Sequence, residues 1–324
     1  MRKVLDKRMK RLGSPGEIPD ITKGIVAAIC SALLFGFSPV IAKLAYAGGS
    51  NGITMTFMRA LFGLPVLILL ARRQKIRLRL SREELPAVVL VSLFGAFATT
   101  ILLYTSYSYI NVGMATVLHY IFPVLVMLTN VLFFREKITW WKLLSLVLGF
   151  GGVLTFVGAS RDSDMIGVVL ALGSVASYAF LMIGIERTAI KDMPAVRMSI
   201  YSHTTSLIGS FIIGTATGQL NFKLTPGAWV SSVAVALMVA VGAFTLLNYA
   251  IIKCGASTTA IIAMLEPLTG VLFGWLILKE SLSPINLLGF LLIMSGVVLV
   301  SWYSGRKIPL EGDQEEGNGC KELQ

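Results

Sequence analysis

Charged residues are scarce in this chain. Asp, Glu, Lys and Arg make up 14% of its 324 residues, whereas hydrophobic residues make up 55%. An average soluble domain contains about 25% charged residues, and long apolar runs rarely recur in a soluble protein. The composition therefore argues against a water-soluble protein, including a large one with many buried helices.

Residues that build metal centres, disulfides and nucleotide sites are also few or badly spaced. The cysteines, Cys30, Cys254 and Cys320, are scattered, and the two histidines, His119 and His203, have no partner at metal-ligand spacing. The sequence contains neither an HExxH nor a GxxxxGK[ST] motif. We therefore expect no metal, no cofactor and no ATP-driven transport by this chain alone.

The two ends of the chain are polar. Residues 1–22 are basic and lack the apolar core of a cleavable signal peptide. This pattern predicts a cytoplasmic N-terminal segment followed by an uncleaved first helix. Residues 306–324 are acidic and contain glycine, which is typical of a short disordered cytoplasmic tail.

Between these ends, apolar stretches of about twenty residues follow one another with short breaks. A helix of that length crosses a hydrocarbon core of about 30 Å. The stretches cover residues 24–46, 54–71, 86–109, 113–134, 140–157, 165–186, 198–216, 228–252, 257–278 and 284–303. The sequence therefore predicts an all-α, multi-pass protein of the cell membrane with ten transmembrane helices.

The basic residues indicate the orientation of the helices. If the N-terminus is cytoplasmic, the inner segments hold 23 of the 28 Lys and Arg residues and the outer loops hold three. This is the positive-inside pattern, and it places both termini in the cytoplasm. Topology and anionic lipid explain the net charge of +11, so we expect no nucleic-acid partner.

The second half of the chain repeats the first at a shift of 144 residues. The repeat pairs a proline, a basic residue followed by Glu, and a glycine: Pro123 with Pro267, Arg135-Glu136 with Lys279-Glu280, and Gly152 with Gly296. The repeats cover residues 23–159 and 163–305, with five predicted helices each. Because five is odd, the second repeat is inverted in the membrane, as in many secondary transporters.

Several residues of the two repeats carry a resemblance to a known family. They are Arg59, Pro123 with Arg135-Glu136, Glu266-Pro267 with Lys279-Glu280, and Gly289 with Gly296. On them the chain resembles the drug/metabolite transporter superfamily, in its ten-helix form with two EamA-type domains. The resemblance implies transport of a small solute, in a family that carries amino acids, sugars, nucleotide derivatives and drugs. Phe122 stands where the second half has Glu266, so no acidic role is transferred to the first half.

Three charged residues in the apolar stretches are candidates for substrate binding or coupling. Glu266 lies about 13 Å along its predicted helix, near the middle of the bilayer, where a carboxylate is costly and is by default functional or paired. It could exchange protons or bind substrate, or it could hold helices together. Arg59 and Lys43 lie nearer the outer ends of their helices, where they could attract an anionic group or extend to the interface.

Polar and aromatic residues extend the candidate site. His119 and Tyr120 lie one turn before Pro123, in the stretch that corresponds to the Glu266 stretch in the other repeat. A central cavity could also be lined by Tyr104, Tyr178 and Asn248. Ordinary packing and hydrogen bonds between helices are the alternative for each of these residues.

Prolines and glycines have structural interpretations. Pro123 and Pro267 are expected to kink two helices, where flexibility would help gating. The glycines Gly152, Gly289 and Gly296 are expected to let neighbouring helices approach closely within the bundle.

These observations favour a secondary transporter, an exporter of an amino acid or another small metabolite, that works by alternating access. Its partners would be a small-molecule solute and the lipid bilayer, with proton coupling and a homodimer left open. The alternatives are an intramembrane enzyme and a non-transporting scaffold or channel. No nucleophile–base set with recognisable spacing and no rings of pore-lining polar residues support them.

Overall fold

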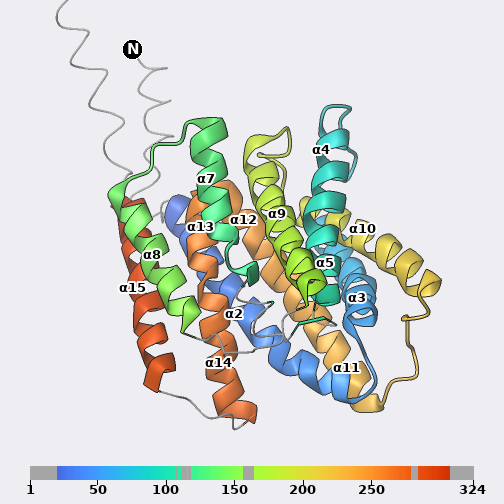
Figure 1. Ribbon diagram of the computed structural model, residues 1–324. Coiled ribbons are helices and arrows are strands. Elements are labelled where there is room, and N and C mark those ends of the chain that lie inside the picture. Colours follow the sequence, from blue (N-terminus) through green and yellow to red (C-terminus); the bar gives the residue numbers. More distant parts are fainter. Residues whose placement is uncertain are drawn as a thin grey trace, which may run out of the picture.

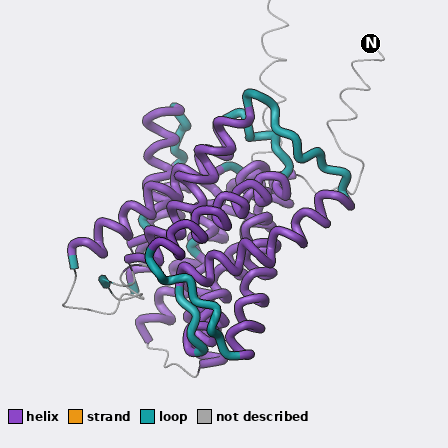
Figure 2. The backbone as a smooth tube through the Cα atoms, turned by 90° about the vertical axis from the view of Figure 1, so that its right-hand side faces the viewer, coloured by secondary structure: helices purple, strands orange, loops and turns teal. Residues whose placement is uncertain are grey.

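The computed structural model describes residues 20–106, 109–110, 115, 118–155, 164–278 and 284–306. Every regular element in these ranges is a helix, so the predicted all-α class is confirmed. Most of the helices run side by side between two faces of the molecule (Figure 1), and the connecting loops gather at these faces (Figure 2).

The elements follow the apolar stretches of the sequence. The first half contains α2 (Asp20–Ala47), α3 (Gly52–Arg73), α4 (Glu84–Leu90), η1 (Val91–Phe97), α5 (Ala98–Ser106), α7 (Phe122–Phe134) and α8 (Trp140–Leu154). The second half contains α9 (Met165–Arg187), α10 (Ala195–Ala216), α11 (Pro226–Val235), η2 (Ala236–Ala243), α12 (Phe244–Cys254), α13 (Ala256–Ala263), α14 (Leu265–Leu278) and α15 (Pro284–Arg306). The segments α4–η1–α5 and α11–η2–α12 each form one continuous rod.

By length and composition, five of the described helices are able to cross a membrane. They are Asp20–Ala47, Gly52–Arg73, Glu84–Ser106, Met165–Arg187 and Pro226–Cys254. Shorter apolar helices lie at Phe122–Phe134, Trp140–Leu154 and Leu287–Tyr303. The count of ten transmembrane helices therefore stays a prediction.

Two features distinguish other predicted spans from these five long apolar helices. Helix α10 carries polar side chains, among them Arg197, Ser199 and His203, which lower its apolar character. The predicted span 257–278 is divided at Met264 into α13 and α14, and the predicted span 113–134 is interrupted at Tyr120–Ile121, directly before α7.

Helical irregularities recur at corresponding positions of the two halves. The wide π-helical turns of η1 and η2 begin at Val91 and Ala236, which lie 145 residues apart. The backbone leaves the helix at Tyr120–Ile121 and again at Met264, 144 residues after Tyr120. Short π segments and interrupted helices are common at functional sites of membrane proteins. We therefore expect the functional site to lie between these positions.

The described ends of the chain lie at the same face of the bundle, which we call the terminal face (Figure 1). At this face Lys253 of α12 donates to Asp20 of α2, with Nζ and Oδ2 2.5 Å apart. Trp141 of α8 contacts Trp302 of α15 there, with ring centroids 6.2 Å apart. Residues 1–19 and 307–324, including most of the predicted N-terminal segment and the tail, lie outside the described residues.

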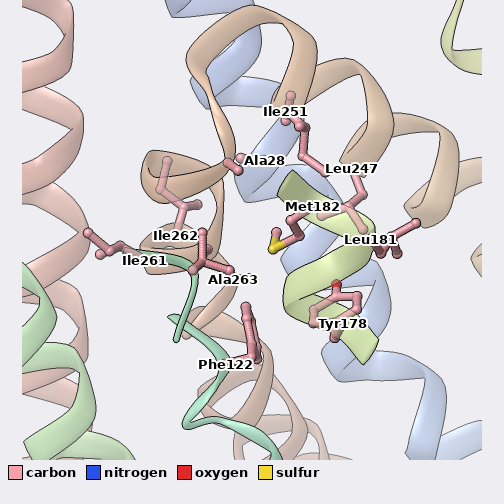
Figure 3. Close-up of a cluster of buried hydrophobic side chains, with 14 of the residues drawn as sticks. Ala28, Phe122, Tyr178, Leu181, Met182, Leu247, Ile251, Ile261, Ile262 and Ala263 are labelled. Carbon is pink, nitrogen blue, oxygen red and sulfur yellow. The ribbon is translucent and has the colours of Figure 1, made fainter. Parts of the chain in front are cut away.

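The largest buried cluster forms where α7, α9, α12 and α13 meet. Phe122, Met182, Leu247 and Ile261 are fully buried in it, and Figure 3 shows the segments that carry these side chains. Large apolar side chains also cover the outside of the bundle, among them Phe133, which is 76% exposed. An apolar exterior around a packed interior is the arrangement expected of helices surrounded by lipid.

Glycines bring α8 and α15 into close contact. A Cβ atom on Gly152 would lie 2.7 Å from the carbonyl oxygen of Gly289, and one on Gly296 would lie 2.7 Å from the carbonyl oxygen of Ser145. No side chain fits there without moving a backbone. The two prolines do not kink the middle of a helix. Pro123 and Pro267 stand in the first turns of α7 and α14, directly after the interruptions.

We predict that Gly152→Ala lowers the free energy of unfolding by about 1–3 kcal/mol, because overpacking forces the two helices apart. Thermal unfolding of the purified protein in detergent measures the effect. Gly151→Ala is the control, since nothing lies within 4 Å of a Cβ atom there. Equal stability of the two variants would contradict the tight contact.

Candidate functional site

A cavity of about 170 Å³ lies between the two halves of the chain. It is lined by Phe35, Ser38, Arg59, Ala96, Thr99, Thr100, Leu103, Tyr104, His119, Tyr120, Tyr178, Leu181, Val239, Phe244 and Glu266. Ala96 belongs to η1, Val239 to η2 and Tyr120 to the first interruption, while Glu266 follows the second by two residues. All four irregular segments therefore meet at this cavity.

Glu266 is held by a tyrosine from the other half of the chain. The hydroxyl of Tyr120 donates to Oε2 of Glu266 at 3.2 Å. The second oxygen, Oε1, is buried and has no hydrogen-bond partner among the described residues. Because Glu266 is the second residue of α14, the positive end of the helix dipole favours a carboxylate there.

Arg59 is held in a similar way. Its Nη1 atom donates to the hydroxyl of Tyr104 at 3.3 Å, and its buried Nε atom has no hydrogen-bond partner within the described ranges. Arg59 lies in the first half of α3, and Tyr104 lies in the last turn of α5. Both therefore lie toward the face opposite the terminal face.

Aromatic rings pack beside these charges. Tyr178 contacts His119 and Phe122, with ring centroids 5.3 Å and 4.6 Å away, and Figure 3 shows Tyr178 close to Phe122. The Nδ1 atom of His119 lies 2.9 Å from the hydroxyl oxygen of Ser174. That hydroxyl donates its only hydrogen to the carbonyl of Ala171, so Nδ1 of His119 must be the donor in its own contact.

The structure brings six of the eight proposed binding residues to the cavity. They are Glu266, Arg59, His119, Tyr120, Tyr104 and Tyr178. Asn248 lies elsewhere: it is fully buried, and its Nδ2 atom donates to the hydroxyl of Ser199 at 3.1 Å, which links α12 to α10. The Lys43 side chain lies outside the described residues.

Sequence reasoning missed several residues that line the cavity, notably Thr99 and Thr100. Their hydroxyls donate to the carbonyls of Gly95 and Ala96, at 2.6 Å and 3.1 Å. These carbonyls belong to η1, where the helical hydrogen-bond pattern is altered. Two adjacent threonines in an otherwise apolar stretch were the available signal.

A second polar group lies at the terminal face, and we call it the terminal cluster. Its members come from both halves of the chain: Asn130, Glu136, Lys142, Glu186, Arg187 and Ser257. Glu136 accepts hydrogen bonds from Lys142 at 2.7 Å and from Ser257 at 3.2 Å. Asn130 donates to Glu186 at 3.2 Å and to Ser257 at 3.0 Å. Glu136 therefore connects the two halves of the chain.

Comparison with protein families gives a match to the EamA-like transporter family over residues 22–158 and again over residues 165–302. The two matches together cover most of the chain, and each lies in one half of it.

Several curated proteins are similar in sequence. The uncharacterized transporter YwfM of Bacillus subtilis is 28% identical over 52% of this chain and 56% of its own, so the match spans little more than half of that relative. An uncharacterized transporter of Archaeoglobus fulgidus is 25% identical over 86% of this chain and 96% of its own. The threonine/homoserine exporter RhtA of Escherichia coli is 26% identical over 85% and 90%.

A crystal structure of another protein has the same fold. It superposes with a TM-score of 0.76 over 87% of this chain and 99% of that chain, at 14% sequence identity. At this identity the likeness shows the fold alone.

We predict that Ser174→Ala lowers the free energy of unfolding by about 1–3 kcal/mol, because the buried Nδ1–H group of His119 loses its acceptor. Denaturant or thermal unfolding measures the loss. Ser295→Ala is the control, since Ser295 is exposed and bonds only within α15. A loss no larger than that of the control would mean that His119 has another acceptor.

Proposed function

Because the chain belongs to the EamA-like transporter family, we propose that it is a secondary transporter that exports a small zwitterionic solute, an amino acid, across the cell membrane. The transporter class and the multi-pass membrane fold follow from the family.

The observation that carries the proposal is a pair of opposite charges in one cavity. Arg59 and Glu266 both line it, and no ion pair joins them within the described part of the chain. Each is held by a tyrosine hydroxyl and keeps one buried polar atom without a partner among the residues that the structure describes. Buried charges without a counter-charge are costly, so a ligand that supplies both counter-charges is favoured.

An amino acid in its zwitterionic form has these two groups. Its carboxylate suits the guanidinium of Arg59, and its ammonium suits the carboxylate of Glu266. Aromatic walls from Phe35, Tyr178 and Phe244 provide contact area for an apolar or aromatic side chain. The similarity to a protein named as a threonine/homoserine exporter supports the same class of solute.

Alternating access accounts for the irregular helices. The π segments and the interruptions recur in both halves and border the cavity, where the backbone can change conformation without exposing polar groups to lipid. The cavity lies toward the face opposite the terminal face, and the terminal cluster closes the other side. For the cavity to open to the terminal face, the hydrogen bonds that Ser257 forms with Glu136 and with Asn130 must break.

The orientation of the chain in the membrane follows from the distribution of charge. The described Lys and Arg residues lie mostly at the terminal face, so by the positive-inside rule it is the cytoplasmic face. Both termini are then cytoplasmic, and the cavity described above faces outward. Glu266 is the group that exchanges a proton during the cycle, because it is the acidic residue of the cavity.

We predict that Arg59→Gln lowers amino-acid transport tenfold or more at low substrate concentration. Loss of a hydrogen bond to a charged group costs about 1.5–3 kcal/mol, and about 1.4 kcal/mol corresponds to a factor of ten. Counterflow of radiolabelled amino acids in proteoliposomes measures the rate, and Glu83→Gln, at an exposed site, is the control. Solute flux without counterflow acceleration would favour a channel, and chemical conversion of the solute would favour an enzyme.

We also predict that Glu266→Gln removes the pH dependence of transport, since an amide cannot exchange a proton. Uptake is measured across a pH series with and without an imposed proton gradient. Arg59→Gln is the matched comparison, because it weakens substrate binding but should keep the pH profile. An unchanged profile in Glu266→Gln would mean that protons are not coupled through this residue.

A further inference from the structure

A second hollow, separate from the transport cavity, lies between α7 and α9. It has a volume of about 440 Å³. It is lined by Leu125, Thr129, Phe133, Phe134, Ala176, Ala179, Phe180, Ile183, Gly184, Arg187 and Thr188. These residues share no member with the lining of the transport cavity, and we call the hollow the α7/α9 groove.

The groove exists because α9 presents small residues between large ones. Ala176 and Ala179 line the groove together with the larger rings of Phe133 and Phe180. Phe133 and Phe180 are 76% and 43% exposed, so the rim of the groove faces the outside of the bundle, where lipid surrounds it.

The groove runs about the depth of one lipid leaflet. From Ala176 to Arg187 the helix rises about 16 Å at 1.5 Å per residue, and half of a ~30 Å hydrocarbon core is about 15 Å. Its far end is apolar, and its other end reaches the terminal face at Arg187. This length suits an extended acyl chain that crosses one leaflet.

The only cation that lines the groove within the described part of the chain is Arg187. Its Nε atom lies 3.3 Å from Glu186 and its Nη2 atom lies 3.5 Å from Glu136, while the guanidinium carbon lies 5.1 Å from the ring centroid of Phe134. These two polar contacts leave Nη1 without a partner among the described residues. A guanidinium with unused N–H groups at the end of an apolar groove suits a phosphate oxygen.

We propose that the α7/α9 groove binds one anionic phospholipid of the cytoplasmic leaflet. One acyl chain lies along Ala176, Ala179 and Ile183, and the phosphate accepts hydrogen bonds from Arg187. Basic pockets between membrane helices on the cytoplasmic side bind anionic head groups by the same chemistry. The proposal rests on the membrane fold and on the orientation proposed above, and not on the nature of the transported solute.

Native mass spectrometry of the full-length protein tests the proposal, after incubation with phosphatidylglycerol or phosphatidylcholine of equal chain length. The wild-type protein should retain one phosphatidylglycerol at least fivefold more than phosphatidylcholine. Ala176→Phe should abolish retention of both lipids by filling the groove, and Leu172→Phe is its control at an exposed site on the same helix. Arg187→Gln should remove only the preference for phosphatidylglycerol, whereas Lys191→Gln, which is exposed and outside the groove, should keep it.

Equal retention of both lipids by the wild-type protein would overturn the proposal, as would retention by Ala176→Phe equal to that of Leu172→Phe. A dimer that Ala176→Phe dissociates, with no lipid bound to the wild type, would assign the groove to a second copy of the chain instead. Because Arg187 also contacts Glu136, Arg187→Gln is judged only if its thermal stability is retained. Ala176→Phe does not touch that contact and tests the groove by itself.

Discussion

The structure depends on the need of every backbone N–H and C=O group to form a hydrogen bond where no water is present. In hydrocarbon this need is met by helices, and every described regular element of the chain is a helix. Departures from the helix are tolerated only where the freed groups face protein or a polar cavity. The π segments η1 and η2 and the interruptions at Tyr120–Ile121 and Met264 follow this rule, since residues in or beside each of them line one cavity.

The same constraint explains where polar side chains lie. Thr99 and Thr100 donate to carbonyls within η1, so the irregular backbone is partly satisfied by its own side chains. Glu266 lies in the first turn after an interruption, where a helix N-terminus tolerates negative charge. Interruptions therefore create both the space and the electrostatic conditions for a charged group inside the bundle.

Polar residues also gather toward the two opposite faces of the bundle, with an apolar core between them. The terminal cluster joins α7, α8, α9 and α13 at one face, and Arg59 and Tyr104 lie toward the other. Between them lies the apolar core around Phe122 and Met182. Arg187 belongs to the terminal cluster and also ends the α7/α9 groove, so a lipid in that groove would lie beside the contacts that connect the two halves.

The sequence by itself determined the all-α membrane fold, the two related halves and six of the fifteen residues that line the cavity. Its apolar stretches require helices, and an isolated carboxyl group such as Glu266 stands out in them because it is costly in lipid. It also predicted Arg59, Tyr104, His119, Tyr120 and Tyr178, since polar and aromatic groups are rare in such stretches.

Only the tertiary structure decided which of these groups meet. Asn248 looked like the others in the sequence, yet it faces Ser199 and links α10 to α12, because the direction of a side chain depends on how its helix rotates against its neighbours. The π segments, the break at Met264 and the central position of Glu136 also depend on contacts between distant parts of the chain, such as Glu136 with Ser257. Local sequence carries no record of such contacts, and packing alone establishes them.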